Sequence, residues 1–128
     1  MLRCTMEPRF CETDALGHIN NTVVPMWFET ARGPIFEIFN PGQDLTKWNV
    51  ILRKMDVDFI AQIYHGHSVD ITTRIAHVGS TSFICDHEAW QRGELVAKGT
   101  AVMIYFDFAV QCKLEITAEQ RVGLEKLS

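Results

Sequence analysis

The hydrophobic pattern of the chain changes its period near residue 45. From residue 20 or 21 to about Phe39, apolar residues recur at helical spacing and cover most of the circumference, which is typical of a helix surrounded by protein. Asn21 and Thr22 are candidate N-caps, and Asn40-Pro41-Gly42 ends the pattern. We expect Gly33-Pro34 to kink this helix or to end its regular part, because a proline cannot donate to the carbonyl four residues back.

After residue 48 the pattern alternates with a period of two, which is typical of half-buried strands. In the first of these segments we expect Ile51, Met55, Val57 and Phe59 on one face. Turn residues separate the segments, and a capping-box pattern at Thr117 to Gln120 starts a C-terminal helix. The predicted strands span residues 3–9, 49–64, 68–78, 81–91 and 94–108, and the predicted C-terminal helix spans 117–127.

This order of elements predicts an α+β protein. Strands that follow one another through short turns pair antiparallel, and a curved antiparallel sheet wrapped around one long apolar helix buries the apolar face of each. No linker or repeat divides the chain, so we expect a single domain over residues 1–128.

Composition narrows the class of protein. The chain has 128 residues, 47% of them hydrophobic, which suffices for one core. A net charge of −4 without clustered Lys and Arg argues against a nucleic-acid partner. The most apolar segment contains charged residues and prolines, so no membrane span is expected. The four cysteines form no Cys-x-x-Cys pair, and a cytoplasmic location with reduced thiols is the expectation.

The candidate site is the segment from Asp14 to Asn21, directly before the apolar helix. A carboxylate outside a helix N-terminus lies near partial positive charge, and the free N–H groups there can bind an oxyanion. Gly17 allows close backbone approach, and Asn20 and Asn21 can orient groups or cap the helix. Thioester hydrolysis needs such a nucleophile or base and such donors. The simpler interpretation is a loop of turn residues that only caps a helix.

The segment resembles the Asp-x-x-Gly-His-x-Asn-Asn signature of hotdog-fold acyl-CoA thioesterases of the 4-hydroxybenzoyl-CoA thioesterase type. Phe28 to Arg32 also matches the aromatic-Glu-x-Ala-Arg segment common in that family. The resemblance implies a hotdog fold and a carboxylate, here Asp14, that acts as nucleophile or general base. It also implies that the amide at the helix start, here Asn21, polarises the thioester carbonyl.

The same resemblance extends the site to two further positions and to assembly. A backbone amide near the middle strand corresponds to Gly66, and the segment Gly79 to Ser82 resembles one that lies near the bound coenzyme A, which places Ser82 in the substrate site. Coenzyme A would be part of the substrate, with no other cofactor, although a carrier-protein thioester would fit as well. A homodimer or homotetramer is expected.

Several other residues have two interpretations. His18 either contacts the acyl group or supports the loop, and Glu29 either pairs with Arg32 or, as in another thioesterase subtype, is itself catalytic. Cys85 and His87 alternate onto one strand face, either as a nucleophile pair or as core residues. His65 and His67 lack a third ligand at a recognised spacing, so no metal is expected. The cations that can meet coenzyme A phosphates, or be solvated, are Arg74, Arg92, Lys98 and Lys113.

Two other functions remain open on the sequence. Dehydratases and hydratases with this fold also act on thioesters, but their Asp-x-x-x-x-His and His-x-x-x-Gly-x-Pro patterns are absent. A binding module without catalysis is the second, and loss of the aspartate would have favoured it. Pro25 and Gly33-Pro34 depart from the family pattern and leave the length of the acyl chain open.

Overall fold

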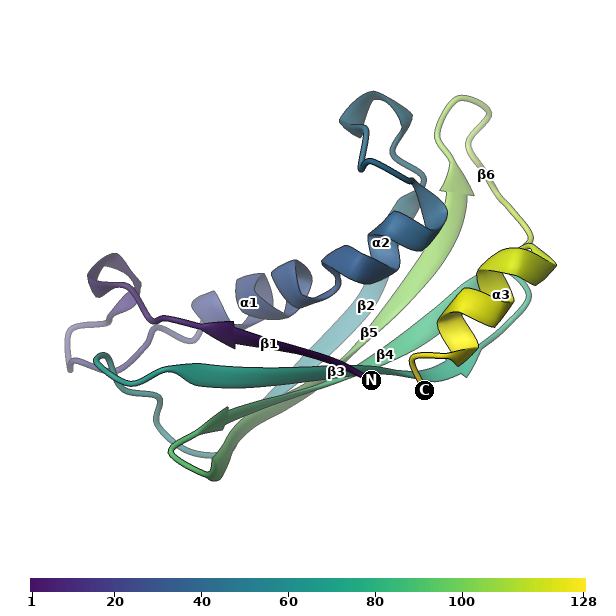
Figure 1. Cartoon of the computed structure of the whole chain (residues 1–128). Coiled ribbons are helices and arrows are strands. Elements are labelled where there is room, and N and C mark those ends of the chain that lie inside the picture. The colour runs from purple at the N-terminus through teal and green to yellow at the C-terminus, as the bar shows by residue number, and fades with distance from the viewer.

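A curved antiparallel sheet forms the body of the molecule in the computed structural model, which describes all 128 residues (Figure 1). The strands follow the order β1-β3-β4-β5-β2, and a short β6 pairs with β5. Each neighbouring pair is antiparallel, and short turns join the sequential pairs β3–β4 and β4–β5, whereas β1 and β2 pair with strands that are distant in the sequence. The bounds are β1 Leu2–Met6, β2 Val50–Phe59, β3 Val69–Val78, β4 Ser82–Gln91, β5 Glu94–Asp107 and β6 Cys112–Lys113.

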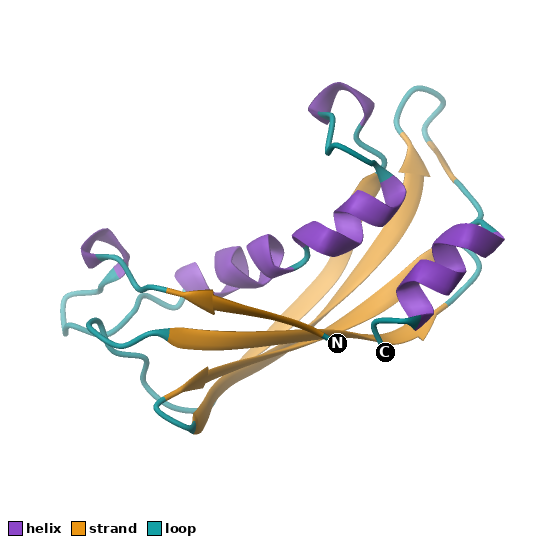
Figure 2. Ribbon diagram, viewed as in Figure 1, coloured by secondary structure: helices purple, strands orange, loops and turns teal.

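The apolar helix lies along the concave side of the sheet and is broken at Arg32 into α1 (Val23–Ala31) and α2 (Gly33–Phe39) (Figure 2). The expected interruption at Gly33-Pro34 is therefore confirmed: Pro34 starts the second helix, where a missing N–H costs nothing. This curved sheet around one apolar helical segment is the hotdog fold expected from the sequence.

The core consists of the inward residues of the sheet and the inner face of the two helices. Val69, Ile71, Thr73 and Ile75 of β3 are each at most 3% exposed, as the alternation predicted. One apolar cluster surrounds α1 and a second surrounds α2. Both helices are therefore fixed against the sheet by apolar contacts, which set where the N-terminal end of α1 points.

The expected faces of β2 are wrong in its first half. A β-bulge between Leu52 and Lys54 shifts the register against β5, so the strand buries Val50 before the bulge and turns Met55 and Val57 inward after it. A bulge inserts one extra residue, here Arg53, and reverses the alternation. Ile51 is therefore not on the face of Met55.

The same strand ends at Phe59, five residues earlier than expected. The chain leaves the sheet there, and Ile63 turns inward to 4% exposure. The carbonyl of Ile63 accepts the N–H of Ile19 at 2.8 Å. Residues 60–64 thus lie against the segment before α1 and do not extend the strand.

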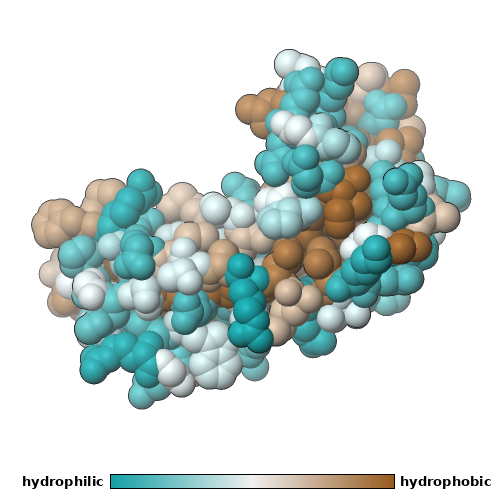
Figure 3. All heavy atoms as spheres, in the orientation of Figure 1, coloured by the Kyte–Doolittle hydropathy of each residue, from teal (hydrophilic) through white to brown (hydrophobic).

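The C-terminal helix α3 (Ala118–Glu125) is confirmed, with Thr117 and Gln120 forming the expected capping box. It packs against α2, and Leu124 is fully buried in the second cluster. Two short 3-10 turns, η1 (Phe10–Glu12) and η2 (Leu45–Lys47), precede α1 and β2. On the face seen in Figure 3, apolar side chains gather around α2.

Candidate active site

Asp14 lies in a tight loop whose backbone closes on itself. The Asp14 N–H donates to the carbonyl of His18 at 2.7 Å, and Thr13 pairs with Ile19 as an isolated antiparallel bridge. Gly17 has φ +81°, a conformation that favours glycine. Asp14 Oδ1 accepts the N–H of Leu16 at 2.7 Å and of His18 at 3.1 Å. Both bonds go to one carboxylate oxygen, and Oδ2 accepts no hydrogen bond from the protein.

The start of α1 lies beside this carboxylate. Asn20 lies just before the helix and binds its first N–H groups: its Oδ1 accepts the Thr22 N–H at 2.9 Å, and its carbonyl accepts the Val23 N–H at 3.0 Å. Thr22, one of the two expected residues, is therefore the N-cap of α1, but its own side chain makes no capping hydrogen bond, and the Asn20 side chain bonds to its N–H instead. The exposed Asn21 contributes its N–H to none of these bonds.

A groove of about 640 Å³ contains Asp14 together with both asparagines. Asp14 is the only charged side chain among its lining residues, and most of the others are apolar. A ligand in this groove meets a carboxylate, a helix N-terminus and an apolar wall at once. Besides Asp14, the lining residues are Ile19, Asn20, Asn21, Val24, Phe59, Ile60, Ala61, Gln62 and Ile63.

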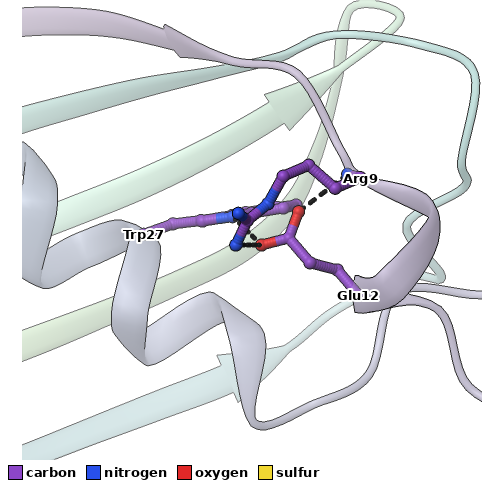
Figure 4. Close-up of polar contacts among 3 residues, drawn as sticks. All are labelled: Arg9, Glu12 and Trp27. Atoms are coloured by element: carbon purple, nitrogen blue, oxygen red, sulfur yellow. Dashed lines mark hydrogen bonds and ion pairs between the residues drawn. The ribbon is translucent and has the colours of Figure 1, made fainter.

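A buried carboxylate that the sequence analysis missed holds this loop against α1. Glu12 is 6% exposed and accepts the indole N–H of Trp27 at 3.1 Å and the backbone N–H of Arg9 at 2.7 Å (Figure 4). Burial by itself raises the pKa of Glu12, but these hydrogen bonds and the Arg9 guanidinium outweigh it and lower that pKa below its ordinary value. Glu12 is therefore ionised where it holds the loop.

A second turn supports the loop from the other side. His18 pairs with Tyr64 as an isolated bridge, and the two rings meet edge-on with centroids 5.2 Å apart. Gly66 follows in this turn with φ +97°. The buried Gln91 fixes the turn through hydrogen bonds to both backbone groups of Tyr64 and to the His67 carbonyl. Neither His18 nor Gly66 lines the groove.

The other expected contacts to coenzyme A lie elsewhere in the chain. Ser82 begins β4, whereas Gln91 at the end of β4 touches the Tyr64 turn, so Ser82 is roughly 30 Å from that end of the sheet. Arg74 pairs with Asp86 at 2.9 Å on the outer face, where Lys98 also lies. Lys113 is in β6, and Arg92 is in the β4–β5 turn, at the Asp14 end of the sheet.

The expected pair of Glu29 with Arg32 is wrong. Arg32 is 1% exposed and is in neither of the two ion pairs of the chain, while Glu29 is exposed. The Arg32 Nη1 donates instead to His87 Nε2 at 3.1 Å, because the break between α1 and α2 turns the guanidinium towards the sheet. His87 then donates from Nδ1 to the Thr73 hydroxyl at 2.8 Å.

Cys85 and His87 are core residues and not a nucleophile pair. Burial, with a smaller contribution from Asp86, raises the pKa of Cys85 to about 12 despite the opposing effect of Arg32, so the thiol stays protonated. Burial and the neighbouring guanidinium lower the pKa of His87 to about 3. The Phe28 ring stacks on His87 with centroids 4.7 Å apart.

This neutral His87 predicts a loss of stability in mild acid. Between pH 6.5 and 3 the unfolded chain binds a proton at this residue that the folded chain does not, so stability falls as pH falls. We expect the free energy of unfolding, measured by urea denaturation, to drop by about 2 kcal/mol from pH 7 to pH 5 on account of His87. His87→Gln should abolish that drop, and substitution of the exposed His77 by Gln should retain it. An unchanged drop in His87→Gln would contradict a buried neutral imidazole.

Metal-ligating side chains and membrane-spanning helices are the remaining features that bear on the site. The chain brings no three His, Cys, Asp or Glu side chains together in an arrangement that could hold a metal ion. His65 contacts the Phe10 ring, and the carbonyl of His67 is bound by Gln91. None of the helices has the length and apolar character needed to cross a membrane.

Comparison with known families identifies the class of protein. The model of the thioesterase-like superfamily matches residues 8–122. The protein therefore belongs to the thioesterase-like superfamily. The matched range includes Asp14, the groove and every strand of the sheet except β1.

Two similar solved structures are of proteins described as thioesterases. The structure of a predicted thioesterase from Bacillus stearothermophilus has a TM-score of 0.96 at 37% identity, covering 98% of this chain and 95% of that chain. A Thermus thermophilus thioesterase complexed with coenzyme A and Zn has a TM-score of 0.87 at 27% identity, covering 98% and 92%. The uncharacterized protein YsmA of Bacillus subtilis (strain 168) is 27% identical over 75% of this chain. That match spans 66% of YsmA, just under two thirds.

Proposed function

We propose that this protein hydrolyses acyl-CoA thioesters, with Asp14 as the catalytic carboxylate. The observation that carries the proposal is the groove in which Asp14, with Oδ2 free, lies beside the uncommitted N–H of Asn21 at the start of α1. A thioester carbonyl placed between them meets a nucleophile or base on one side and an oxyanion donor on the other.

Two routes to the products fit this geometry. In the first, Asp14 attacks the carbonyl carbon, the C–S bond breaks, the thiolate leaves, and water cleaves the resulting anhydride. In the second, Asp14 takes a proton from water as that water attacks the same carbon, and the C–S bond then breaks with loss of the thiolate. Both routes give one carboxylate and one free coenzyme A. In both, the N–H of Asn21 would bind the oxygen as it gains charge. Gly66 lies outside this groove, so as a second donor it would have to come from another subunit.

The substrate follows from the groove and from the relatives. Apolar walls formed by residues such as Val24 and Ile63 suit the acyl group or the pantetheine arm. The Thermus thermophilus relative, whose structure contains coenzyme A, supports coenzyme A as the thiol half of the substrate. A carrier-protein thioester would present the same arm. Gly17, His18 and Asn20 would then shape the loop around it, and Ser82 would meet the coenzyme from a second subunit.

Assembly into a homodimer, or a pair of dimers, is part of the proposal. β2 is the last strand in the sheet order, so its outer edge is unpaired. Leu52 and Phe59 of β2, and Ile60 directly after it, are at least 41% exposed. Exposed strand edges of this kind invite a second strand. Sedimentation should give at least twice the 14.6 kDa of the chain. We place the protein in the cytoplasm, in keeping with four unpaired cysteines.

The test is release of thiol from a panel of acyl-CoA substrates that varies chain length and aromatic character. We expect the purified protein to release thiol from at least one of them above the rate without enzyme. Hydration of an enoyl-CoA without thiol release would support the dehydratase or hydratase alternative. Binding without turnover across the panel would support a non-catalytic acyl-CoA module.

A further inference from the structure

The Asp14 loop is joined to the core through a side chain that the proposed chemistry does not use. We propose that Glu12 is a positioning residue for Asp14: its buried carboxylate clamps the loop to α1 and fixes the catalytic carboxylate in the groove. This inference rests on the proposed function of Asp14. We call the contacts of Glu12 with Arg9 and Trp27 the Glu12 anchor.

The Glu12 anchor uses both carboxylate oxygens. Oε1 accepts the Arg9 N–H at 2.7 Å, while Oε2 accepts the indole N–H of Trp27 at 3.1 Å and lies 3.5 Å from Arg9 Nη2. Figure 4 shows the carboxylate between these two partners, which come from the start of η1 and from α1. Hydrogen bonds to a buried ionised group are stronger than neutral ones.

The anchor connects the backbone of the loop to the core. Trp27 is 6% exposed and belongs to the apolar cluster around α1. The Glu12 carbonyl accepts the N–H of Asn20 at 2.8 Å, so one residue ties down both ends of the segment 13–19. Because Asp14 follows Glu12 by only two residues, any displacement of the Glu12 anchor also displaces Asp14.

The effect of losing the anchor should fall on turnover rather than on substrate affinity. Glu12 does not line the groove, whose walls are formed by other residues such as Ile19, Val24 and Phe59. A displacement of roughly 1 Å in a reacting group is enough to lower a rate by about a hundredfold. We therefore expect Glu12→Gln to reduce kcat by about 10-fold to 100-fold while KM changes less than about threefold.

Substitutions of Glu12 and of Trp27 test whether the hydrogen bond between these two side chains is responsible for the effect on kcat. Glutamine keeps one acceptor oxygen but presents an NH₂ group to the second donor, and Trp27→Phe removes the indole N–H while keeping an aromatic ring. Because the two changes break the same contact, the double variant should lose little more kcat than the more impaired single variant. Thr117→Ala is the matched control, since it removes the side-chain cap of the distant α3 and should leave kcat unchanged.

Hydrogen exchange supplies a readout independent of activity. In Glu12→Gln we expect faster exchange of the amides of residues 13–20 and unchanged protection in α2 and β4. Unchanged exchange in the loop would overturn the anchor. Faster exchange with wild-type kcat would overturn the positioning role. Asp14→Asn, assayed in parallel, separates the two claims: its inactivity beside a fully active Glu12→Gln leaves the proposed function intact, while its full activity overturns the role of Asp14 itself.

Discussion

Replacing Asp14 with asparagine should lower kcat for thioester hydrolysis by about a thousandfold or more and leave KM within a few fold. The substitution is conservative for the loop, because an amide oxygen at Oδ1 can still accept the N–H groups of Leu16 and His18. It removes the negative charge and the free oxygen that would attack the thioester or water. Steady-state kinetics of thiol release on the best substrate of the panel measures both constants.

The matched control is the same substitution at Asp86, which pairs with Arg74 on the outer face of the sheet. An exposed ion pair of this kind contributes little to stability, about 0 to 1 kcal/mol, so Asp86→Asn should keep wild-type kcat. Asp14→Asn and the control should have similar melting temperatures. A fully active Asp14→Asn would show that another group performs the chemistry.

Gly99→Ala should destabilise the protein by about 3 kcal/mol, at the upper end of the usual range for overpacked cores. Gly99 lies in β5 opposite Val57, under the helix. A Cβ atom there would collide with the carbonyl oxygen of Asp56 and lie 3.2 Å from Phe28 Cε2. Because backbone and a core aromatic ring oppose it together, neither can move aside freely. Urea denaturation of the variant and the wild type measures the difference.

Gly33→Ala provides the comparison. The nearest atom to a Cβ at Gly33 is Gln43 Nε2 at 4.0 Å, and alanine is a better helix former than glycine. This variant should be as stable as the wild type or more so. Equal stability of Gly99→Ala and Gly33→Ala would show that α1 does not pack against β5 as closely as described.

The order of elements was predictable because each depends on local pattern. Alternation identified β3, β4 and β5 to within one residue at each end, and Pro34 identified the break between α1 and α2. The faces of β2 were not predictable, since Ile51 and Val50 are equally apolar and only the pairing with β5 reveals the bulge. The early end of β2 likewise depends on Ile63 packing against the distant segment before α1.

The candidate site likewise has a part that the sequence predicted and a part that it could not. The carboxylate, glycine and asparagines of residues 14–21 are adjacent in the sequence, and the structure gathers Asp14, Asn20 and Asn21 at one groove. The partners that hold them are distant: Trp27 meets Glu12 across 15 residues, and Arg32 meets His87 across 55. Glu29 was a closer candidate for Arg32 by helical spacing, but the helix break directs the arginine inward. The roles of His18, Gly66 and Ser82 stay predictions.

Quantifying both products of the reaction tests the central role of Asp14 most directly. Acyl-CoA is incubated with wild type or with Asp14→Asn, the reaction is quenched, and coenzyme A and the carboxylic acid are measured by mass spectrometry. Hydrolysis through Asp14 predicts equal amounts of the two products with the wild type and only background with the variant. Intact acyl-CoA with the wild type, or equal product from both proteins, would contradict it.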